Sequence, residues 1–358
     1  MNILLLTYQG DLAGSTLSIT YLAKGLALRG HNVYVGSRRE SLLFTYLKNS
    51  EFQAIPMTFQ SKTDWKNSKH IREICDQSNI DIINAQSSID RYTSIIAKKL
   101  LGTPAKLVFT RRQVSKSIGG PQSWLYQWGS DKILAVSEGI RESIENDGIS
   151  PGHIAVIRNG TPPEKYENID WKKAEELRSS YGISVADFVI GCVGRLKKQC
   201  QLLEALKYVD RPLTVVFVGI DRIPDFDLSA LESSGHRIYF AGRMPASDVL
   251  PYYGLFNVMV LASASEGLSQ SLLEAMYLKV PVIATAAAGN LDLIDDGRNG
   301  LLFQDGDVKT LAFHIKQIRE DNQLREYLSQ EGYQSASVDL SLENTLDGYE
   351  KLFKELLN

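Results

Sequence analysis

Residues 258–285 read VMVLASASEGLSQSLLEAMYLKVPVIAT, so that an apolar segment, a loop with one glycine, a helical stretch and a second apolar segment follow one another. Residues 258–262 and 282–284 have the uninterrupted apolar character of strands that are buried on both faces. Residues 269–278 are predicted to form the helix between them. Glu266 then lies in the loop at the carboxyl end of a strand, which is where open α/β sheets bind ligands.

Two glutamates flank the start of this helix. Glu266 precedes it, and Glu274 lies more than one turn inside it. Gly267 lets backbone N–H groups approach a ligand closely, and a helix N-terminus attracts phosphate. Such a pair on its own is common on solvated surfaces, but its position after a buried strand favours a site for a sugar nucleotide.

The composition is that of a globular protein with two domains of ordinary size. The chain has 358 residues, 44% of them hydrophobic and 23% charged, and its net charge of −3 argues against general nucleic-acid binding. No run of 18 apolar residues occurs and the N-terminal residues lack a basic segment, so neither a membrane span nor a signal peptide is expected. We expect a cytoplasmic protein, with the inner face of the membrane as an alternative location, and reduced cysteines without zinc spacing.

Charge is distributed unevenly along the chain. Residues 1–165 contain 20 Lys and Arg against 14 Asp and Glu, whereas the remainder contains 19 against 28. A basic first half suits an approach to anionic lipid or to an anionic acceptor. Scattered surface lysines explain the same surplus equally well.

Strand and helix patterns alternate along the first half and again along the second. A polar connector over residues 160–182 separates the halves. The alternation predicts an α/β fold with two Rossmann-like, doubly wound domains that face each other across a cleft, over residues 1–165 and 166–341. Residues 342–358 carry a helical apolar stripe and are expected to pack back on the first domain. The predicted strands span residues 2–7, 32–36, 81–85, 106–110, 132–136 and 155–158, then 188–193, 213–218, 237–240, 257–261, 280–285 and 300–303.

A series of short motifs makes the chain similar to one known family. The motifs are DKILAVSEGIR at 131–141, VIRNG at 156–160, VGRL at 193–196, FVG at 217–219, FAGR at 240–243, the stretch 266–274, PVIAT at 281–285 and GRNGLL at 297–302. In this order, they resemble the family-4 retaining glycosyltransferases of the GT-B fold, also called glycosyl transferases group 1, over nearly the whole chain.

This resemblance implies transfer of a sugar from a nucleotide-diphosphate donor to an acceptor hydroxyl, with retention of configuration and with neither a metal nor a cofactor. Cell-surface polysaccharide, lipopolysaccharide or glycolipid synthesis is the expected setting. The expected partners are a glycan or a lipid-linked acceptor, with peripheral membrane association and no nucleic acid. A sugar-nucleotide epimerase or hydrolase and a non-catalytic nucleotide-sugar-binding protein are the alternatives.

By the same resemblance, the diphosphate is held by Arg195, which follows Gly194 at the end of a strand, and by Lys198. Lys197 is the alternative to Lys198, because the family usually has a Lys-Gly pair five residues after the arginine, where this chain has Cys200 and Gln201. Fixed cations at this point stabilise the charge that develops on the leaving diphosphate. Arg195 is therefore the leading catalytic candidate.

The resemblance also divides the roles of the two glutamates. Glu274 accepts hydrogen bonds from the ribose hydroxyls, and Glu266 contacts the donor sugar and stabilises the reacting centre. The backbone of Gly267, Leu268 and Ser269 binds near the sugar and the phosphates. A carboxylate pairs well with vicinal hydroxyls, which agrees with the ribose role.

In the first half, Gly14 and Ser15 lie in the loop before a helix predicted to begin near Leu17, where N–H groups can cradle the donor diphosphate or the loop can admit the acceptor next to it. Arg111 and Arg112 end another strand, near the point where the family has a histidine. An arginine remains protonated and cannot act as a general base. It can bind a donor hydroxyl, a phosphate or an anionic acceptor, and a surface role is an equal alternative.

Two aromatic groups have two interpretations. Tyr252 and Tyr253, and likewise Trp124, Tyr126 and Trp128, either line a sugar or lipid groove or belong to the core. Aromatic residues at such spacing belong more often to the core. The core is therefore the default prediction for all five.

Overall fold

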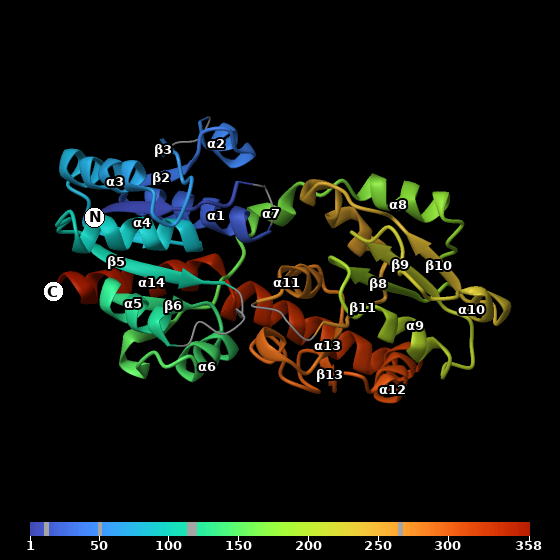
Figure 1. Ribbon diagram of the computed structural model, residues 1–358. Coiled ribbons are helices and arrows are strands. Elements are labelled where there is room, and N and C mark those ends of the chain that lie inside the picture. Colours follow the sequence, from blue (N-terminus) through green and yellow to red (C-terminus); the bar gives the residue numbers. More distant parts are fainter. Residues whose placement is uncertain (11–13, 49–51, 113–119, 264–267) are drawn as a thin grey trace. The chain divides into compact units, whose positions relative to one another are not determined.

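The computed structural model describes residues 1–10, 14–48, 52–112, 120–263 and 268–358 (Figure 1). The chain divides into two compact units. Unit 1 comprises Met1–Pro162 together with Leu340–Asn358, and unit 2 comprises Pro163–Asp339. Each unit is built on a parallel sheet with helices, so the predicted α/β class is confirmed.

The described part of unit 1 contains a seven-stranded sheet in the order β3-β2-β1-β4-β5-β6-β7. All of its neighbouring strands pair in parallel. Six strands match predicted segments, but β3 was not predicted, because Pro56 interrupts its pattern. A proline is tolerated in β3 because that strand lies at the edge of the sheet. The strands are β1 Asn2–Leu6, β2 Asn32–Arg38, β3 Gln53–Met57, β4 Ile82–Ala85, β5 Lys106–Arg111, β6 Lys132–Ala135 and β7 Ile154–Val156.

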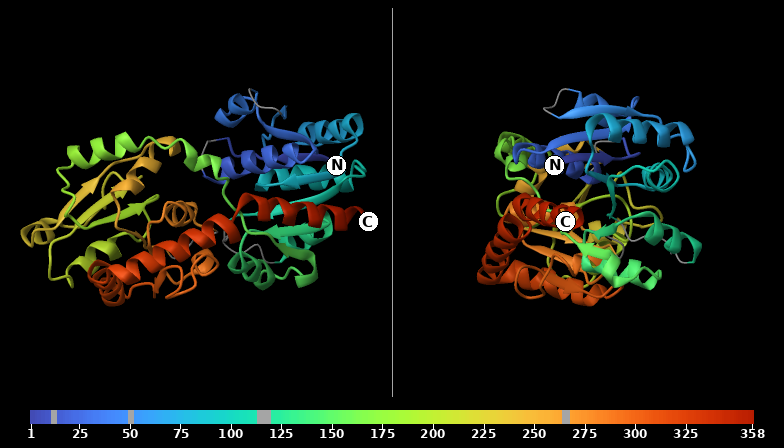
Figure 2. Two further views of the ribbon diagram at one scale, coloured as in Figure 1. Left: turned by 180° about the vertical axis from the view of Figure 1, so that it is seen from behind. Right: turned by 90° about the vertical axis from the view of Figure 1, so that its left-hand side faces the viewer.

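The C-terminal helix α14 belongs to unit 1, where it packs against α1 (Figure 2). Leu346, Tyr349 and Phe353 on α14 are buried. Gly25 gives Leu346 its space, because a Cβ on this glycine would lie 2.5 Å from a methyl group of Leu346. The helices of unit 1 are α1 Gly14–Leu28, α2 Leu42–Leu47, α3 Trp65–Ser78, α4 Ser88–Lys99, α5 Pro121–Gly129, α6 Glu138–Asn146, the short η1 Pro151–His153 and α14 Leu342–Leu357.

The described part of unit 2 contains a six-stranded sheet in the order β10-β9-β8-β11-β12-β13, again with parallel pairs throughout. From β8 the strand order proceeds to β9 and β10 on one side of the sheet, and from β11 it proceeds to β12 and β13 on the other side. The neighbours β8 and β11 therefore mark the point at which the strand order reverses. Ligands bind at such a point in open α/β sheets. The strands are β8 Val189–Val193, β9 Thr214–Val218, β10 Arg237–Phe240, β11 Val258–Leu261, β12 Val282–Thr285 and β13 Leu301–Phe303.

The polar connector is more ordered than its sequence indicates. Two helices, α7 and α8, form within residues 160–182, and both belong to unit 2. Helix α8 packs against η3 of that unit. The helices of unit 2 are α7 Glu164–Glu167, α8 Trp171–Ser180, α9 Cys200–Leu206, α10 Ser229–Ser233, α11 Gln270–Tyr277, α12 Val308–Glu320 and α13 Asn322–Gln334, with the short η2 Ala246–Asp248, η3 Leu250–Leu255, η4 Ala288–Asn290 and η5 Ser335–Asp339.

Candidate functional site

The candidate site of unit 2 lies where β8 and β11 end. Because these strands are parallel neighbours, the loop after β8 and the loop that leads to α11 leave the same edge of the sheet. Glu266 and Gly267 lie outside the described residues. Leu268 is half-buried, and Ser269 is the buried N-cap of α11, whose side chain accepts from the Leu272 N–H. The helix predicted over 269–278 therefore forms over Gln270–Tyr277, one residue shorter at each end, with Ser269 and Leu278 as its caps.

Backbone hydrogen bonds of glycines link the carboxyl ends of β8, β9 and β10 beside this site. The Gly194 N–H donates to the Val218 carbonyl over 3.0 Å, and the Gly219 N–H donates to the Gly242 carbonyl over 2.9 Å. Gly219 has a φ of +88°, and a Cβ at this position would lie 2.6 Å from the Gly194 carbonyl oxygen. This close approach fixes the backbone just before Arg195.

Gly219→Ala is expected to destabilise the protein by about 2–3 kcal/mol, because the left-handed backbone is strained by a Cβ and the methyl group meets backbone rather than a flexible side chain. Chemical denaturation followed by circular dichroism measures this loss. Gly297→Ala is the matched control, because Gly297 has a φ of +75° but no atom within 4 Å of its Cβ position. Equal losses in the two variants would show that the contact with Gly194 has no energetic effect.

The loop after β8 carries three exposed cationic side chains, Arg195, Lys197 and Lys198. Gln199 is buried and donates from Nε2 to the Arg195 carbonyl over 2.8 Å, which holds the loop closed on itself. Lys198 forms an ion pair with Asp305, which also accepts from Gln201 Nε2 over 2.9 Å. The bonds from Lys198 and Gln201 lower the pKa of Asp305. Lys198 therefore lies in the same loop as Arg195, but in this structure its ammonium group is paired with Asp305.

Glu274 on α11 has partners on both of its carboxylate oxygens. Lys165 Nζ lies 2.6 Å from Oε1, and the Tyr253 hydroxyl donates to Oε2 over 2.8 Å. Burial, and after it the charge of Glu274, raises the pKa of Tyr253 well above its ordinary value, so Tyr253 stays protonated and remains a donor. A carboxylate has about four acceptor positions, so two remain available on Glu274 for hydroxyl groups.

The sequence did not reveal the two partners of Glu274. Lys165 belongs to the short helix α7, where the neighbouring Tyr166 stacks on Tyr277 of α11 with 3.9 Å between ring centroids. The lysine precedes Glu274 by 109 residues, so no sequence motif could have indicated that the two side chains are in contact. Tyr252 and Tyr253 are both buried, as the core prediction required, and the hydroxyl of Tyr253 also has a polar role.

In unit 1, Gly14 and Ser15 are the first two residues of α1 rather than part of the loop before it, so the helix begins earlier than predicted. The first N–H groups of a helix have no partner inside it, so the backbone of these residues keeps its capacity to bind an anion. Residues 11–13, just before α1, lie outside the described residues.

Arg111 and Arg112 follow the predicted strand, as the last residue of β5 and the residue after it. Arg112 donates to the Gln86 side chain over 3.1 Å and to the Ser18 hydroxyl on α1 over 2.8 Å. Burial, and then the nearby charge of Arg91, lowers the pKa of Arg111 to about 10, and burial also lowers the pKa of Arg112. Arg111 is buried and Arg112 half-buried, so neither side chain is fully solvated.

Arg91 and Asp90 complete this group. Arg91 donates to the carbonyls of Gln86 and Thr110, over 2.9 and 2.6 Å. Asp90 is completely buried, and burial raises its pKa to about 6 even though it accepts from the backbone of Gln86 and Ser87. Three arginines and one carboxylate therefore lie near the carboxyl edge of the unit 1 sheet.

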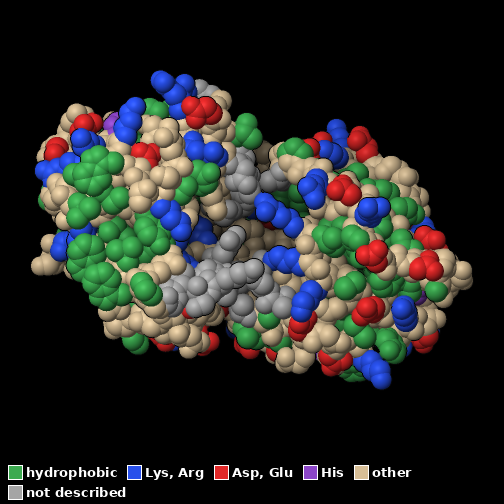
Figure 3. All heavy atoms as spheres, viewed as in Figure 1, with side chains coloured by type: hydrophobic (Ala, Val, Ile, Leu, Met, Phe, Trp, Pro, Cys, Tyr) green, Lys and Arg blue, Asp and Glu red, His purple; other side chains and the backbone are tan. Residues whose placement is uncertain are grey.

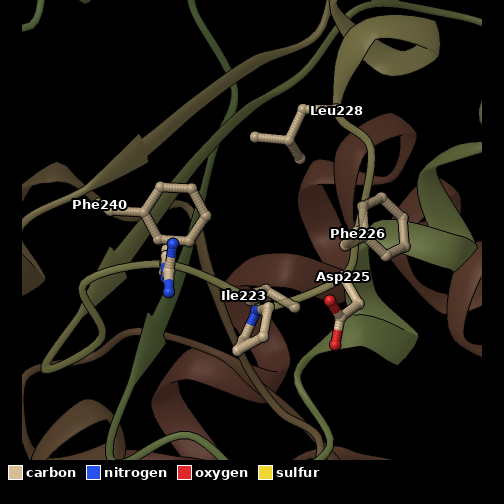
Figure 4. A pocket seen from close by; sticks show the side chains of 7 residues that line it. Ile223, Asp225, Phe226, Leu228 and Phe240 are labelled. Carbon is tan, nitrogen blue, oxygen red and sulfur yellow. The ribbon is translucent and has the colours of Figure 1, made fainter.

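A separate pocket of about 370 Å³ lies beside the edge strand β10 of unit 2 (Figure 4). Its apolar wall is formed by Ile223, Phe226, Leu228 and Phe240, and none of the residues predicted for the site lines it. Within the described ranges, no group of three or more His, Cys, Asp or Glu side chains is placed to hold a metal ion. No described helix has both the length and the apolar character needed to cross a membrane.

Two family profiles match the chain. Residues 13–165 match the profile described as Glycosyltransferase Family 4, and residues 173–335 match the profile described as Glycosyl transferases group 1. A capsular polysaccharide biosynthesis glycosyltransferase, CapM of Staphylococcus aureus, is 27% identical over 63% of this chain and 62% of its own length.

Solved structures resemble the fold over its whole length. A glycosyltransferase from Rickettsia africae has a TM-score of 0.87 and 24% identity over 100% of this chain and 98% of its own. The Anabaena protein HepE, solved in complex with UDP-glucose, has a TM-score of 0.80 and 21% identity over 99% of this chain and 100% of its own. At this level of identity, the likeness to these structures concerns the fold.

Proposed function

Since the chain belongs to the group 1 glycosyl transferases, with a family 4 glycosyltransferase N-terminal half and the GT-B fold, we propose that it is a retaining enzyme that transfers a sugar from a nucleoside-diphosphate donor. One observation carries this proposal. The loop with Arg195 and the helix with Glu274 follow β8 and β11, the two strands between which the strand order reverses. A cation for the diphosphate and a carboxylate for the ribose thus belong to one ligand-binding edge.

Glu274 suits the ribose because it is already oriented. The contacts from Lys165 and Tyr253 hold its two oxygens in place before a ligand arrives, so little side-chain entropy is lost on binding. Vicinal hydroxyls then donate to its remaining acceptor positions. Uridine is the first base to test, because HepE is a structural neighbour solved with UDP-glucose.

Arg195 and Lys198 stabilise the departing diphosphate. The bond between the anomeric carbon and the diphosphate oxygen breaks with its electron pair on that oxygen, and the cations offset the charge that forms there. Lys198 leaves Asp305 to reach the phosphate, which costs little because this ion pair is solvent-exposed. Two side-chain cations supply the charge stabilisation that a metal provides in other enzymes, so the reaction proceeds without a metal or a cofactor.

The acceptor hydroxyl attacks the anomeric carbon from the face that the diphosphate leaves. Its oxygen forms the new glycosidic bond, and its proton passes to a phosphate oxygen of the leaving group, so no protein nucleophile takes part. Glu266 stabilises the positive charge that develops on the sugar. We propose a glycan or lipid-linked acceptor used in surface polysaccharide or glycolipid synthesis, which the likeness to CapM supports.

A panel of nucleotide sugars, tested with and without pooled glycan and glycolipid acceptors, checks this proposal through nucleotide release. We expect release that depends on an acceptor, persists in EDTA and gives a product with the anomeric configuration of the donor in its NMR spectrum. Release without any acceptor would indicate a hydrolase, and conversion of the donor into an epimeric nucleotide sugar without release would indicate an epimerase. Donor binding without transfer would indicate a binding protein, and loss of turnover in EDTA that added Mg²⁺ restores would contradict metal independence.

A further inference from the structure

A series of hydrogen bonds between buried polar side chains runs through the core of unit 1 to Arg112. Asn84 in β4 and Thr110 in β5 are completely buried, and Asn84 Nδ2 donates to Thr110 Oγ1 over 3.0 Å. Asn84 Oδ1 accepts from Nε2 of Gln86, which is also buried. Gln86 Oε1 accepts from Arg112 Nε over 3.1 Å, and Arg112 Nη1 donates to the Ser18 hydroxyl over 2.8 Å. We call Asn84, Gln86 and Thr110 the polar network.

The chemistry of Arg112 fixes the direction of the bonds in the polar network. A guanidinium has only donors, so Gln86 must turn its oxygen toward Arg112 and its amide nitrogen toward Asn84. Asn84 therefore accepts through Oδ1 and turns its nitrogen toward the Thr110 hydroxyl. On the other side of Thr110, the Tyr349 hydroxyl of α14 lies 3.4 Å from Oγ1. Each amide thus has one allowed orientation, and the two amides hold the guanidinium in one orientation.

The other face of β5 packs without polar groups. Phe109 precedes Thr110 on this strand and points to the opposite face, where it lies edge-to-face on the buried Tyr126 of α5 at 5.2 Å. The core prediction is therefore correct for Tyr126, but it is wrong for Trp124 and Trp128, which are 67% and 43% exposed. Figure 3 shows hydrophobic side chains gathered over α5. The core of this sheet can thus be built from apolar residues.

Burying the polar network has a cost that packing does not explain. Its neighbours on β4 and β5, Ile83 and Val108 among them, are completely buried apolar residues. Replacing a buried hydrogen-bonded pair by apolar groups of the same shape is often neutral or stabilising. A polar network inside such a core therefore indicates a role other than stability, and Arg112 is its charged end.

Arg112 lies where the strand order of unit 1 reverses. From β1 the order proceeds to β2 and β3, and from its neighbour β4 it proceeds to β5, β6 and β7 on the other side. Gln86 follows β4 and Ser18 lies on α1, the helix after β1, so the guanidinium that binds both spans this point, where ligands bind. Arg112 Nη2 is buried and has no hydrogen-bond partner among the described residues. A phosphate or carboxylate oxygen would supply one.

We propose that Asn84, Gln86 and Thr110 are positioning residues, which hold Arg112 oriented for an oxyanion of the substrate. As buried side chains they act through Arg112, because an arginine that is already ordered loses little entropy when it binds. The oxyanion belongs either to the donor diphosphate or to a phosphate or carboxylate of the acceptor. This role rests on the proposed transfer reaction and adds to it a fixed cation in unit 1.

A double-mutant cycle on kcat/KM tests whether Asn84 acts through Arg112, with a donor and an acceptor that support transfer. We expect Arg112→Ala to lower kcat/KM by about 10- to 100-fold, because a charged hydrogen bond to the substrate is lost. Asn84→Ala should lower it by about tenfold, because the guanidinium loses its orientation. The double variant should be no slower than Arg112→Ala, since Asn84 then has nothing to position. Full activity of Asn84→Ala, or effects that multiply in the double variant, would overturn the proposal.

Asn67→Ala is the matched control. Asn67 is also a buried asparagine of unit 1 that donates to a threonine hydroxyl, but its described side-chain bonds go to Thr93 and to the Thr58 backbone rather than to the polar network. It should lose stability as Asn84→Ala does and keep its kcat/KM. An equal loss of activity in Asn67→Ala would show that lost stability is the cause.

Thr110→Val keeps the shape of its side chain without the hydroxyl, so it tests the polar network even if Asn84→Ala does not fold. We expect Thr110→Val to lower kcat/KM, and Thr110→Ser, which restores the hydroxyl, to match the unchanged protein. Full activity of Thr110→Val would contradict a positioning role.

Isothermal titration calorimetry identifies the source of the oxyanion. Weaker binding of the donor's nucleoside diphosphate to Arg112→Ala would assign the oxyanion to the donor. Unchanged nucleotide binding with a raised acceptor KM would assign it to the acceptor. No change in either quantity would remove Arg112 from substrate binding and overturn the proposal.

An NMR measurement separates the positioning role from the transfer reaction. In protein labelled with ¹⁵N-arginine, the Nε–H signal of Arg112 is the one missing from Arg112→Lys. Its exchange with solvent should be slow in the unchanged protein and in Asn67→Ala, and about tenfold faster in Asn84→Ala. If no donor and acceptor support transfer, the proposed function fails while this measurement still applies. Equal exchange in all three proteins would show that Asn84 does not hold Arg112.

Discussion

Arg195→Ala is expected to lower kcat for sugar transfer by about 10²- to 10³-fold, the loss typical of removing a group that stabilises charge in the transition state. The effect falls on kcat because the charge on the diphosphate increases as the glycosidic bond breaks. Arg195 lies in the loop directly after β8, behind a glycine whose carbonyl is held close to Gly219, so the cation is carried on a fixed backbone. Single-turnover kinetics with a saturating donor measure the chemical step.

Arg211→Ala is the control for Arg195→Ala. Arg211 is also an exposed arginine, but it precedes β9 and so belongs to the amino edge of the same sheet. We expect its loss to leave kcat unchanged. Arg195→Lys should recover part of the rate, because it keeps the charge but loses the two-pronged guanidinium. Full activity of Arg195→Ala would remove Arg195 from the reaction and leave Lys198 or Lys197 as the candidate.

Glu274→Gln is expected to raise the dissociation constant of the donor by about 10- to 100-fold, because the ribose hydroxyls lose a charged acceptor. The amide keeps the size of the side chain but presents only one oxygen. It also leaves the Lys165 ammonium without its partner, which should lower stability by about 1–3 kcal/mol. Isothermal titration calorimetry measures the first effect and chemical denaturation the second.

The two effects of Glu274→Gln can be separated with Lys165. In Lys165→Met/Glu274→Gln the unpaired ammonium is gone, so we expect stability to recover while donor binding stays weak. Lys165→Met alone should weaken donor binding less than Glu274→Gln, because it loosens the carboxylate without removing it. If the double variant recovered binding together with stability, Glu274 would be structural and the assignment to ribose would fail.

The sequence predicted most of the sheet because parallel strands are buried on both faces and appear as short apolar runs. It did not predict β3, where an edge position tolerates Pro56, or the short helix α5, which begins at Pro121 and contains the consecutive apolar residues Trp124, Leu125 and Tyr126. The two helices within the polar connector, α7 and α8, were not predicted either. These helices expose most of their polar residues. The residues that they do bury are covered by contacts with unit 2, which the local sequence pattern does not indicate.

The site was predicted unevenly. Arg195 and Glu274 follow strands that are easy to recognise, so their place at one sheet edge follows from the order of elements. The contacts of Glu274 with Lys165 and Tyr253 depend instead on tertiary packing, in which Tyr166 stacks on Tyr277 and brings the lysine to the carboxylate. The ion pair of Lys198 with Asp305 joins two loops 107 residues apart. No local pattern carries such information, and the roles of all these residues stay predictions.

The position of α14 has a consequence for how the protein folds while it is being synthesised. Unit 1 is discontinuous in the chain, and its second piece buries Leu346, Tyr349 and Phe353. The Gly160 N–H also uses that piece, since it donates to the Thr345 hydroxyl over 2.7 Å. Unit 2 is continuous and can fold as soon as it has emerged. We therefore expect the part of unit 1 that is synthesised first to keep the apolar surface under α14 uncovered until residues 340–358 have emerged.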